Sequence, residues 1–123
     1  MGELVLIVDD NERNVKLVRD VLGAAGMTTL GASTAAEGIA LAREHVPDIV
    51  LMDLRLPDEA GAEAARRLRA DERTAGIPVV AMSALPLDDA RVAVGEAGFA
   101  GYIEKPVDVS ALPAQVRRHL VGG

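Results

Sequence analysis

Aspartates stand directly after two continuous apolar runs of this sequence. Asp9-Asp10 follow the run 4–8, and Asp53 follows the run 49–52. Such runs are typical of strands buried on both faces, and in parallel α/β sheets ligand chemistry gathers where the strands end. Carboxylates that meet there repel one another unless a cation joins them. Because the ligands are all oxygens and the chain has no cysteine, the expected ion is hard, Mg²⁺ (or Mn²⁺).

A hydroxyl and an ammonium follow later apolar runs, at Ser83 and Lys105. Each could bind one oxygen of a phosphoryl group. Phosphate loops usually contain glycine, whereas Asp-Asp-Asn-Glu follows the first run, so a nucleotide phosphate could not be held there without a metal. Phosphoryl transfer onto Asp53 suits the set, because carboxylates can form aspartyl phosphates. Taken singly, each residue also has an ordinary interpretation: a cap or strand-end acid, a turn hydroxyl, or a solvated lysine.

The spacing of apolar residues predicts five strands that alternate with five helices. The expected strands are 4–8, 27–32, 48–53, 77–82 and 99–103, and the expected helices are 12–25, 34–44, 62–71, 86–97 and 109–120. Helical spacing in the second helix is shown by Ala36, Ile39, Ala40 and Arg43. The last helix has a clear apolar stripe of Val109, Leu112, Val116 and Leu120. Alternation of this kind predicts right-handed crossovers and a parallel sheet with helices on both faces.

Bulk properties narrow the class of protein. The length of 123 residues suits one domain, over residues 1–123. A net charge of -6, with one tyrosine, one phenylalanine and no tryptophan, argues against a nucleic-acid partner. The apolar runs are too short to span a bilayer, and no secretory signal is visible. We therefore expect a cytoplasmic domain with no membrane partner.

Four short motifs stand in order along the chain: Val8-Asp9-Asp10-Asn11, Asp53-x-x-x-Pro57-x-x-x-Gly61, Ser83-Ala84 and Lys105-Pro106. Together they resemble the receiver domain of two-component response regulators, over essentially the whole chain. Residues 10–17 and 101–107 are most similar to single-domain regulators of the DivK type, and also to receivers attached to hybrid histidine kinases. The resemblance implies a flavodoxin-like (βα)5 fold, a doubly wound parallel sheet with strand order 2-1-3-4-5.

The resemblance also implies a role for each motif residue. Asp53 is the expected phosphoacceptor, and the expected metal ligands are Asp9, Asp10, Asp53 and the backbone carbonyl of Arg55. Ser83 is the expected switch hydroxyl, Tyr102 the switch aromatic, and Lys105 a partner of the phosphoryl group. Structural roles are expected for Pro57, Gly61 and Pro106, the last after a cis peptide bond.

The expected function is a phosphorylation switch and not an enzyme. A histidine kinase or a histidine phosphotransfer protein would donate the phosphoryl group, docking on the first helix around Arg13, Asn14, Lys16 and Leu17. Because the sequence ends after the fifth helix, we expect no output domain and a downstream protein partner that reads the face over about 87–120. A monomer or a weak phosphorylation-dependent dimer is expected. The alternatives are an interaction module that works without phosphorylation, and a phosphate shuttle or sink.

Overall fold

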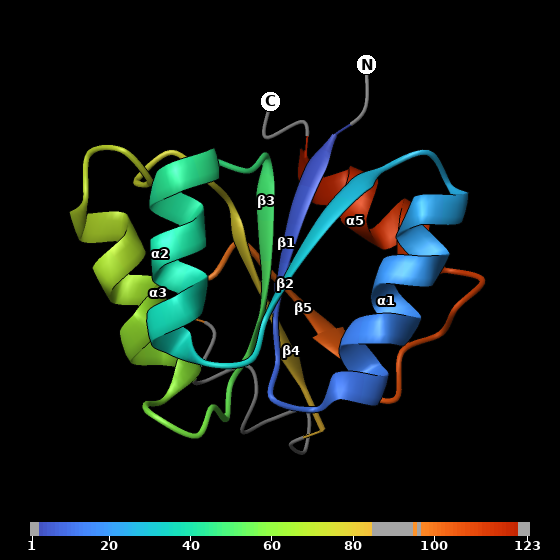
Figure 1. Ribbon diagram of the computed structural model, residues 1–123, viewed down its shortest axis with the longest axis horizontal. Helices are drawn as coiled ribbons and strands as arrows, with labels where there is room; N and C mark the ends of the chain where they lie inside the picture. The colour runs from blue at the N-terminus through green and yellow to red at the C-terminus, as the bar shows by residue number, and fades with distance from the viewer. Residues whose placement is uncertain (1–2, 85–94, 96, 121–123) are drawn as a thin grey trace.

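The computed structural model describes residues 3–84, 95 and 97–120 (Figure 1). Along the chain the elements are β1 (Leu4–Val8), α1 (Glu12–Ala24), β2 (Thr28–Ala32), α2 (Ala35–His45), β3 (Ile49–Asp53), α3 (Gly61–Ala70), β4 (Val79–Ser83), β5 (Gly101–Glu104) and α5 (Leu112–Leu120). The helix predicted over 86–97 lies almost wholly outside the described residues. No helix among the described residues is long and apolar enough to cross a membrane.

The strands form one parallel sheet in the order β2-β1-β3-β4-β5, which confirms the predicted fold and strand order. The register pairs Val8 with Met52 and Asp53 with Met82. The strands therefore end at nearly one level, at the lower edge of the sheet in Figure 1. This alignment brings the residues that follow β1, β3, β4 and β5 together at one edge.

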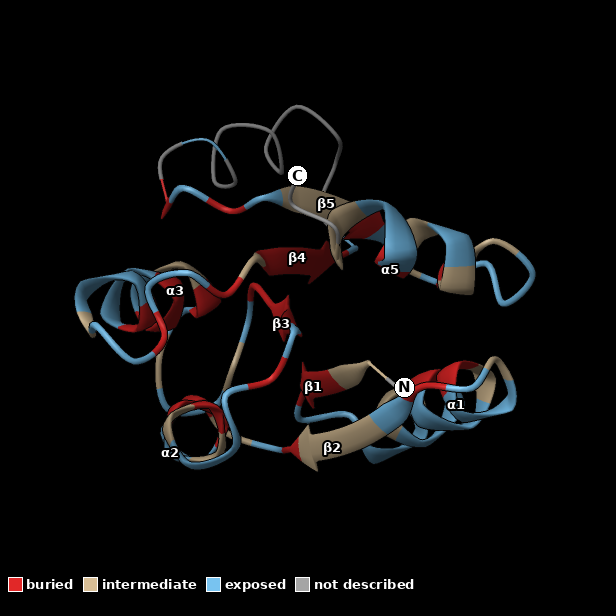
Figure 2. Ribbon diagram, turned by 90° about the horizontal axis from the view of Figure 1, so that it is seen from above, coloured by how far each residue is buried: buried red, intermediate tan, exposed pale blue. Residues whose placement is uncertain are grey.

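Two apolar layers enclose the sheet, with α1 and α5 on one face and α2 and α3 on the other (Figure 2). Alternate residues of each central strand enter opposite layers: Val5 and Ile7 pack toward α1 and α5, and Leu6 and Val8 toward α2 and α3. All five residues of β3 and of β4 are buried. Burial on both faces explains why these strands read as continuous apolar runs.

Side-chain caps fix where the first two helices begin. The Asn11 side chain accepts hydrogen bonds from the backbone N–H groups of Arg13 and Asn14. Asn11, and not Asp10, is therefore the N-cap of α1. Thr34 caps α2 by accepting from the Glu37 N–H, while the Glu37 carboxylate accepts from the backbone N–H of Ser33. This reciprocal pair resembles a capping box, except that Glu37 accepts from the residue before the cap rather than from the cap itself.

Of the residues at helical spacing in the second helix, only Ile39 lies on its buried face. The buried residues are Ala35, Gly38, Ile39 and Ala42, whereas Ala36 and Ala40 are exposed. Gly38 explains the rotation, because a Cβ built there would lie 2.7 Å from Cγ2 of Val8. The glycine lets the helix approach β1 closely, so it takes a core position where an apolar pattern favours alanine.

The predicted start of the last helix was wrong. α5 begins at Leu112 rather than Val109, and Val109 is 48% exposed. Pro113 has no N–H to donate to the carbonyl of Val109, which restricts it to the first turn of a helix. Before it, the Asp108 carboxylate accepts from the backbone N–H groups of Ser110 and Ala111 and organises a turn. The remaining limits of the described elements differ from prediction by at most two residues.

Candidate functional site

Carboxylates converge at the edge where β1 and β3 end. Asp9 follows β1 directly, Asp10 comes next, and Asp53 is the last residue of β3. One carboxylate oxygen from each of these residues lies within 4.8 Å of the others. Asp9 and Asp53 are buried, and Asp10 is exposed. The cluster follows from the topology, because β1 and β3 are neighbours in the sheet.

Lys105 joins two of these carboxylates. Its Nζ lies 2.8 Å from Oδ2 of Asp9 and 2.8 Å from Oδ2 of Asp53. Its backbone N–H donates to the carbonyl of Ser83 at 2.8 Å, which fixes the chain after β5 beside the end of β4. The peptide bond between Lys105 and Pro106 is cis, as predicted. Lys105 follows β5, yet its side chain reaches past the end of β4 to the acids at the ends of β1 and β3.

Asp9 has further donors on both oxygens. Oδ1 accepts from the Asn11 backbone N–H at 2.9 Å, and Oδ2 accepts from the Asn14 side-chain amide at 2.6 Å. Asn14 entered the sequence prediction only as part of a docking surface, so its contact with the acid was missed. Its place in the first turn of α1, on the side that faces back to the end of β1, was the available signal.

The two buried acids differ in their ionisation. Burial alone would raise the pKa of Asp9, but the Lys105 ammonium and the N–H donors of Asn11 and Asn14 outweigh burial and lower it. Burial raises the pKa of Asp53, because the Arg55 N–H and Lys105 offset it only in part and the negative charge of Asp9 adds to it. For Lys105 the two carboxylates outweigh burial and raise the pKa. The ammonium is therefore held charged, and Asp53 is the more basic acid.

The loop after β3 turns back on itself. The Asp53 carboxylate accepts from the Arg55 N–H at 3.0 Å, and the Leu54 carbonyl accepts from the Gly61 N–H at 3.0 Å. Arg55 and Ala60 form an isolated antiparallel bridge. Gly61 sits directly on the strand end, where a Cβ would lie 2.1 Å from the Asp53 carbonyl oxygen. Only glycine fits this contact, which supports a structural role for Gly61.

Asp58, at the far side of the same loop, was not singled out from the sequence. Its carboxylate accepts from the backbone N–H groups of Ala35 at 2.9 Å and Ala36 at 3.0 Å, in the first turn of α2. These two bonds lower the pKa of Asp58. Pro57 beside it is exposed. No local pattern identifies Asp58, because its partners lie more than 20 residues away.

Ser83 and Tyr102 meet on the neighbouring strands. Ser83 ends β4 and is buried, and its backbone carbonyl accepts from the Tyr102 hydroxyl at 3.3 Å. Burial and the charge of Glu104 raise the pKa of Tyr102, so the phenol keeps the proton that it donates. The structure therefore brings both predicted switch residues into contact through the backbone of Ser83.

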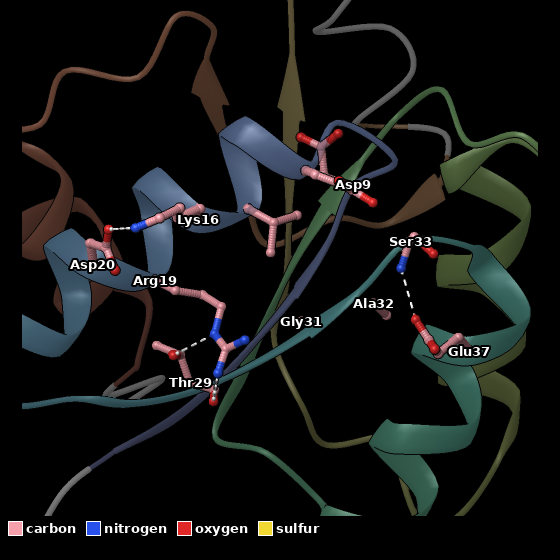
Figure 3. A pocket seen from close by; sticks show the side chains of 11 residues that line it. Asp9, Lys16, Arg19, Asp20, Thr29, Gly31, Ala32, Ser33 and Glu37 are labelled. Atoms are coloured by element: carbon pink, nitrogen blue, oxygen red, sulfur yellow. Dashed lines mark hydrogen bonds and ion pairs between the residues drawn. The ribbon is translucent and has the colours of Figure 1, made fainter.

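A groove of about 460 Å³ opens beside the acid cluster, between α1, β2 and the start of α2 (Figure 3). Asp9 lies at one end of it. Arg19 reaches from α1 to the edge strand β2, where Nε donates to the Thr29 hydroxyl at 3.0 Å and Nη2 to the Thr29 carbonyl at 3.3 Å. The arginine thus occupies an acceptor on the outer edge of the sheet, which discourages pairing with another strand.

Comparison with known proteins agrees with this geometry. The profile of the response regulator receiver domain matches residues 5–117. The chain belongs to the response regulator receiver family. It is 38% identical to the polar-differentiation response regulator DivK of Brucella ovis over 120 residues, which cover 98% of each chain. Membership makes it a two-component response regulator with an aspartate phosphorylation site, rather than a classical enzyme, and implies a histidine kinase as its partner.

Solved receiver structures share the whole fold. A receiver domain protein of Methanospirillum hungatei superposes with a TM-score of 0.89 at 25% identity, covering 99% of this chain and 96% of the other. The receiver domain of a Pseudomonas aeruginosa sensor histidine kinase superposes with a TM-score of 0.90 at 28% identity, covering 100% of both chains. That second structure has a magnesium ion coordinated in its active-site cleft.

The residues of this receiver fit a hard divalent cation. All donors in the cluster of Asp9, Asp10 and Asp53 are carboxylate oxygens, and their spacing within 4.8 Å allows one ion to touch all three. With all three acids ionised, the single Lys105 ammonium leaves the cluster with two uncompensated negative charges. A divalent cation matches that charge. The predicted acids are therefore brought together as a candidate cation site.

Proposed function

We propose that this receiver is a phosphorylation switch in which Asp53 is the phosphoacceptor. The observation that carries the proposal is the cluster itself: a buried carboxylate of raised pKa, flanked by two more acids and held 2.8 Å from a lysine ammonium. Of the two buried acids, Asp53 has a raised pKa and Asp9 a lowered one, so Asp53 is the better nucleophile, and it lies at the centre of the sheet edge. Asp9 and Asp10 flank it as ligands for a cation.

In the proposed reaction, a carboxylate oxygen of Asp53 attacks the phosphorus of a phosphohistidine on a kinase or phosphotransfer protein. A phosphorus–oxygen bond forms, the phosphorus–nitrogen bond breaks, and the electron pair stays on the imidazole that leaves. Lys105 moves from the carboxylates to a phosphoryl oxygen, and the Ser83 hydroxyl binds another. Asp9, Asp10, Asp53 and the Arg55 carbonyl would hold Mg²⁺, or Mn²⁺, which offsets the negative charge gathered at the site when it is bound.

The output is proposed to run through Ser83 and Tyr102. Movement of the Ser83 backbone toward a phosphoryl group changes the acceptor that the Tyr102 hydroxyl uses, and β5 carries that change to the face built on β5 and α5. The segment 87–94 that would complete this face lies outside the described residues. A swing from 1% to 99% active requires about 5.5 kcal/mol of differential stabilisation. A downstream protein would read this face.

The kinase is proposed to dock on α1 beside the acid pocket. Leu17 is 41% exposed there, and Asn14 links the same helix face to Asp9. Arg13 is exposed nearby, whereas Lys16 is engaged in an ion pair with Asp20 at 2.8 Å. Exchange of Arg13 and Leu17 for the residues of another regulator should redirect kinase preference. Unchanged preference after the exchange would move the docking site elsewhere.

The proposal is tested by intact mass after incubation with Mg²⁺ and acetyl phosphate, with Asp53→Asn alongside. We expect one added phosphoryl group on the native protein and none on the variant. A native protein that takes no phosphoryl group, even from a cognate kinase, would contradict the switch and favour an interaction module that works without phosphorylation. If the variant is also labelled, the acceptor is another residue.

A further inference from the structure

The Asp58 carboxylate connects two segments that are distant in the chain. Oδ1 accepts from the Ala35 N–H and Oδ2 from the Ala36 N–H, at 2.9 and 3.0 Å. Both donors are in the first turn of α2, whose free N–H groups need partners from outside the helix. Asp58 therefore caps the N-terminus of α2 from the β3–α3 loop. Each of its carboxylate oxygens accepts from a different N–H group.

The same loop carries groups of the phosphorylation site. Its first residues are fixed to the end of β3 by the bonds from Arg55 N–H to Asp53 and from Gly61 N–H to the Leu54 carbonyl. Its far side is fastened by Asp58 to α2 and by an ion pair between Glu59 and Arg67 of α3. Arg55, whose carbonyl is a proposed metal ligand, takes part in the first anchorage through its N–H and lies three residues before Asp58 in the same loop.

We propose that Asp58 is a positioning residue for the cation site: by fastening the β3–α3 loop to α2, it holds the Arg55 carbonyl where an ion bound by the aspartates can use it. This inference rests on the proposed function for the identity of that ligand. A neutral carbonyl ligand on a loop contributes more affinity when the loop is already ordered, so a loosened loop weakens the site without removing any carboxylate.

The competing explanation is that Asp58 only stabilises α2. A control variant separates the two, because Asp108 is an exposed acid that accepts from the Ser110 and Ala111 N–H groups before α5, as well as from the Ser110 hydroxyl, the main cause of its lowered pKa. Asp108 has no bond to the β3–α3 loop among the described contacts. Asp58→Ala and Asp108→Ala should therefore cost similar stability, but only Asp58→Ala should alter the cation site.

The experiment measures Mn²⁺ affinity by electron paramagnetic resonance of the free ion, with no phosphodonor present, and Mg²⁺ affinity by displacement. Urea unfolding of each variant establishes that it is folded under the same conditions. We expect Asp58→Ala to bind Mn²⁺ about tenfold more weakly than the native protein, the size typical for loss of an outer partner of a metal site. Asp58→Asn keeps one acceptor oxygen, so its Mn²⁺ affinity should fall between those of Asp58→Ala and the native protein. Asp108→Ala should bind Mn²⁺ as tightly as the native protein.

An Asp58→Ala affinity within twofold of the native value would overturn the inference, as would an equal loss in Asp108→Ala. So would a native protein that binds no Mn²⁺. The phosphorylation test remains separate: if acetyl phosphate fails to label Asp53 while the order of Mn²⁺ affinities is as expected, the proposed function fails and the positioning role of Asp58 stands.

Discussion

Substitution of Gly61 by alanine tests whether the strand end and the loop after it form one rigid unit. The added Cβ would lie 2.1 Å from the Asp53 carbonyl oxygen, 2.9 Å from the Leu54 Cα and 3.0 Å from the Asp53 carbonyl carbon. Ordinary contacts of a Cβ begin near 3.4 Å. Because every atom in the way is backbone, no side-chain rotation relieves the overlap, and the start of α3 must move away from β3 by about 1 Å.

The expected cost follows from that displacement. Overpacking of a buried contact costs about 1–3 kcal/mol, and a clash with three backbone atoms of Asp53 and Leu54 belongs near the upper end. Alanine also restricts the unfolded chain, which returns about 0.5–1 kcal/mol. We therefore expect Gly61→Ala to lower the free energy of unfolding by about 2 kcal/mol. The same movement shifts Asp53 and the Arg55 N–H that it accepts from, so labelling by acetyl phosphate should slow markedly in protein that is still folded.

The control is Gly23→Ala. Gly23 is an exposed residue within α1, and a Cβ built there meets nothing within 4 Å. Alanine should stabilise that helix by about 0.5–1 kcal/mol. The same substitution of glycine by alanine is therefore expected to raise the free energy of unfolding at position 23 and to lower it at position 61. Urea unfolding at constant Mg²⁺ and initial labelling rates supply both measurements. Native stability together with a native labelling rate in Gly61→Ala would refute the reasoning.

Three further predictions concern single contacts or conformations. Val46 ends α2 in a left-handed conformation at φ 45 while 51% exposed, so Val46→Asn should raise the free energy of unfolding by about 1 kcal/mol in urea melts, whereas Val109→Asn at similar exposure should not. Burial raises the folded pKa of Asp53, so the contribution of this residue to stability is present below the unfolded pKa and lost as pH rises through the folded pKa. Asp53→Asn should thus have a higher urea midpoint than the native protein at pH 7, and the difference should close near pH 3. Equal midpoints at pH 7 would contradict this. Arg117 Nη2 donates to the Ala25 carbonyl after α1 at 2.6 Å, so Arg117→Ala should cost about 1 kcal/mol in thermal or urea unfolding, and the same loss in the exposed Arg118→Ala would show that the contact is not the cause.

The sheet and the residues at its edge were predictable because they depend on short-range patterns. Buried parallel strands read as continuous apolar runs, and the ends of those runs are marked by Asp9, Asp53 and Ser83. Once the strand order is known, the meeting of these side chains follows without any knowledge of packing. Lys105 is predictable for the same reason, since it follows β5 directly.

What the sequence could not supply depends on packing between distant elements. Helical spacing did not identify the inner face of α2, because Gly38, which adds nothing to an apolar pattern, is buried against Val8. Asp58 was missed because its partners are the N–H groups of Ala35 and Ala36, and backbone donors leave no trace in residue types. Val109 was placed inward by its spacing, although Pro113 already prevented the helix from reaching it.

The contacts of Asp9 fit a site in which Lys105 changes partners. Phosphorylation of Asp53 would add negative charge beside it, and an ammonium shared between two carboxylates should then turn toward the phosphoryl oxygens. Asp9 would lose one donor in that exchange but keep two others, the Asn11 N–H at 2.9 Å and the Asn14 amide at 2.6 Å. Those donors come from the start of α1, which does not depend on Lys105 for its cap. Asp9 can therefore stay oriented toward a cation while the lysine moves, because the start of α1 holds Asp9 independently of Lys105.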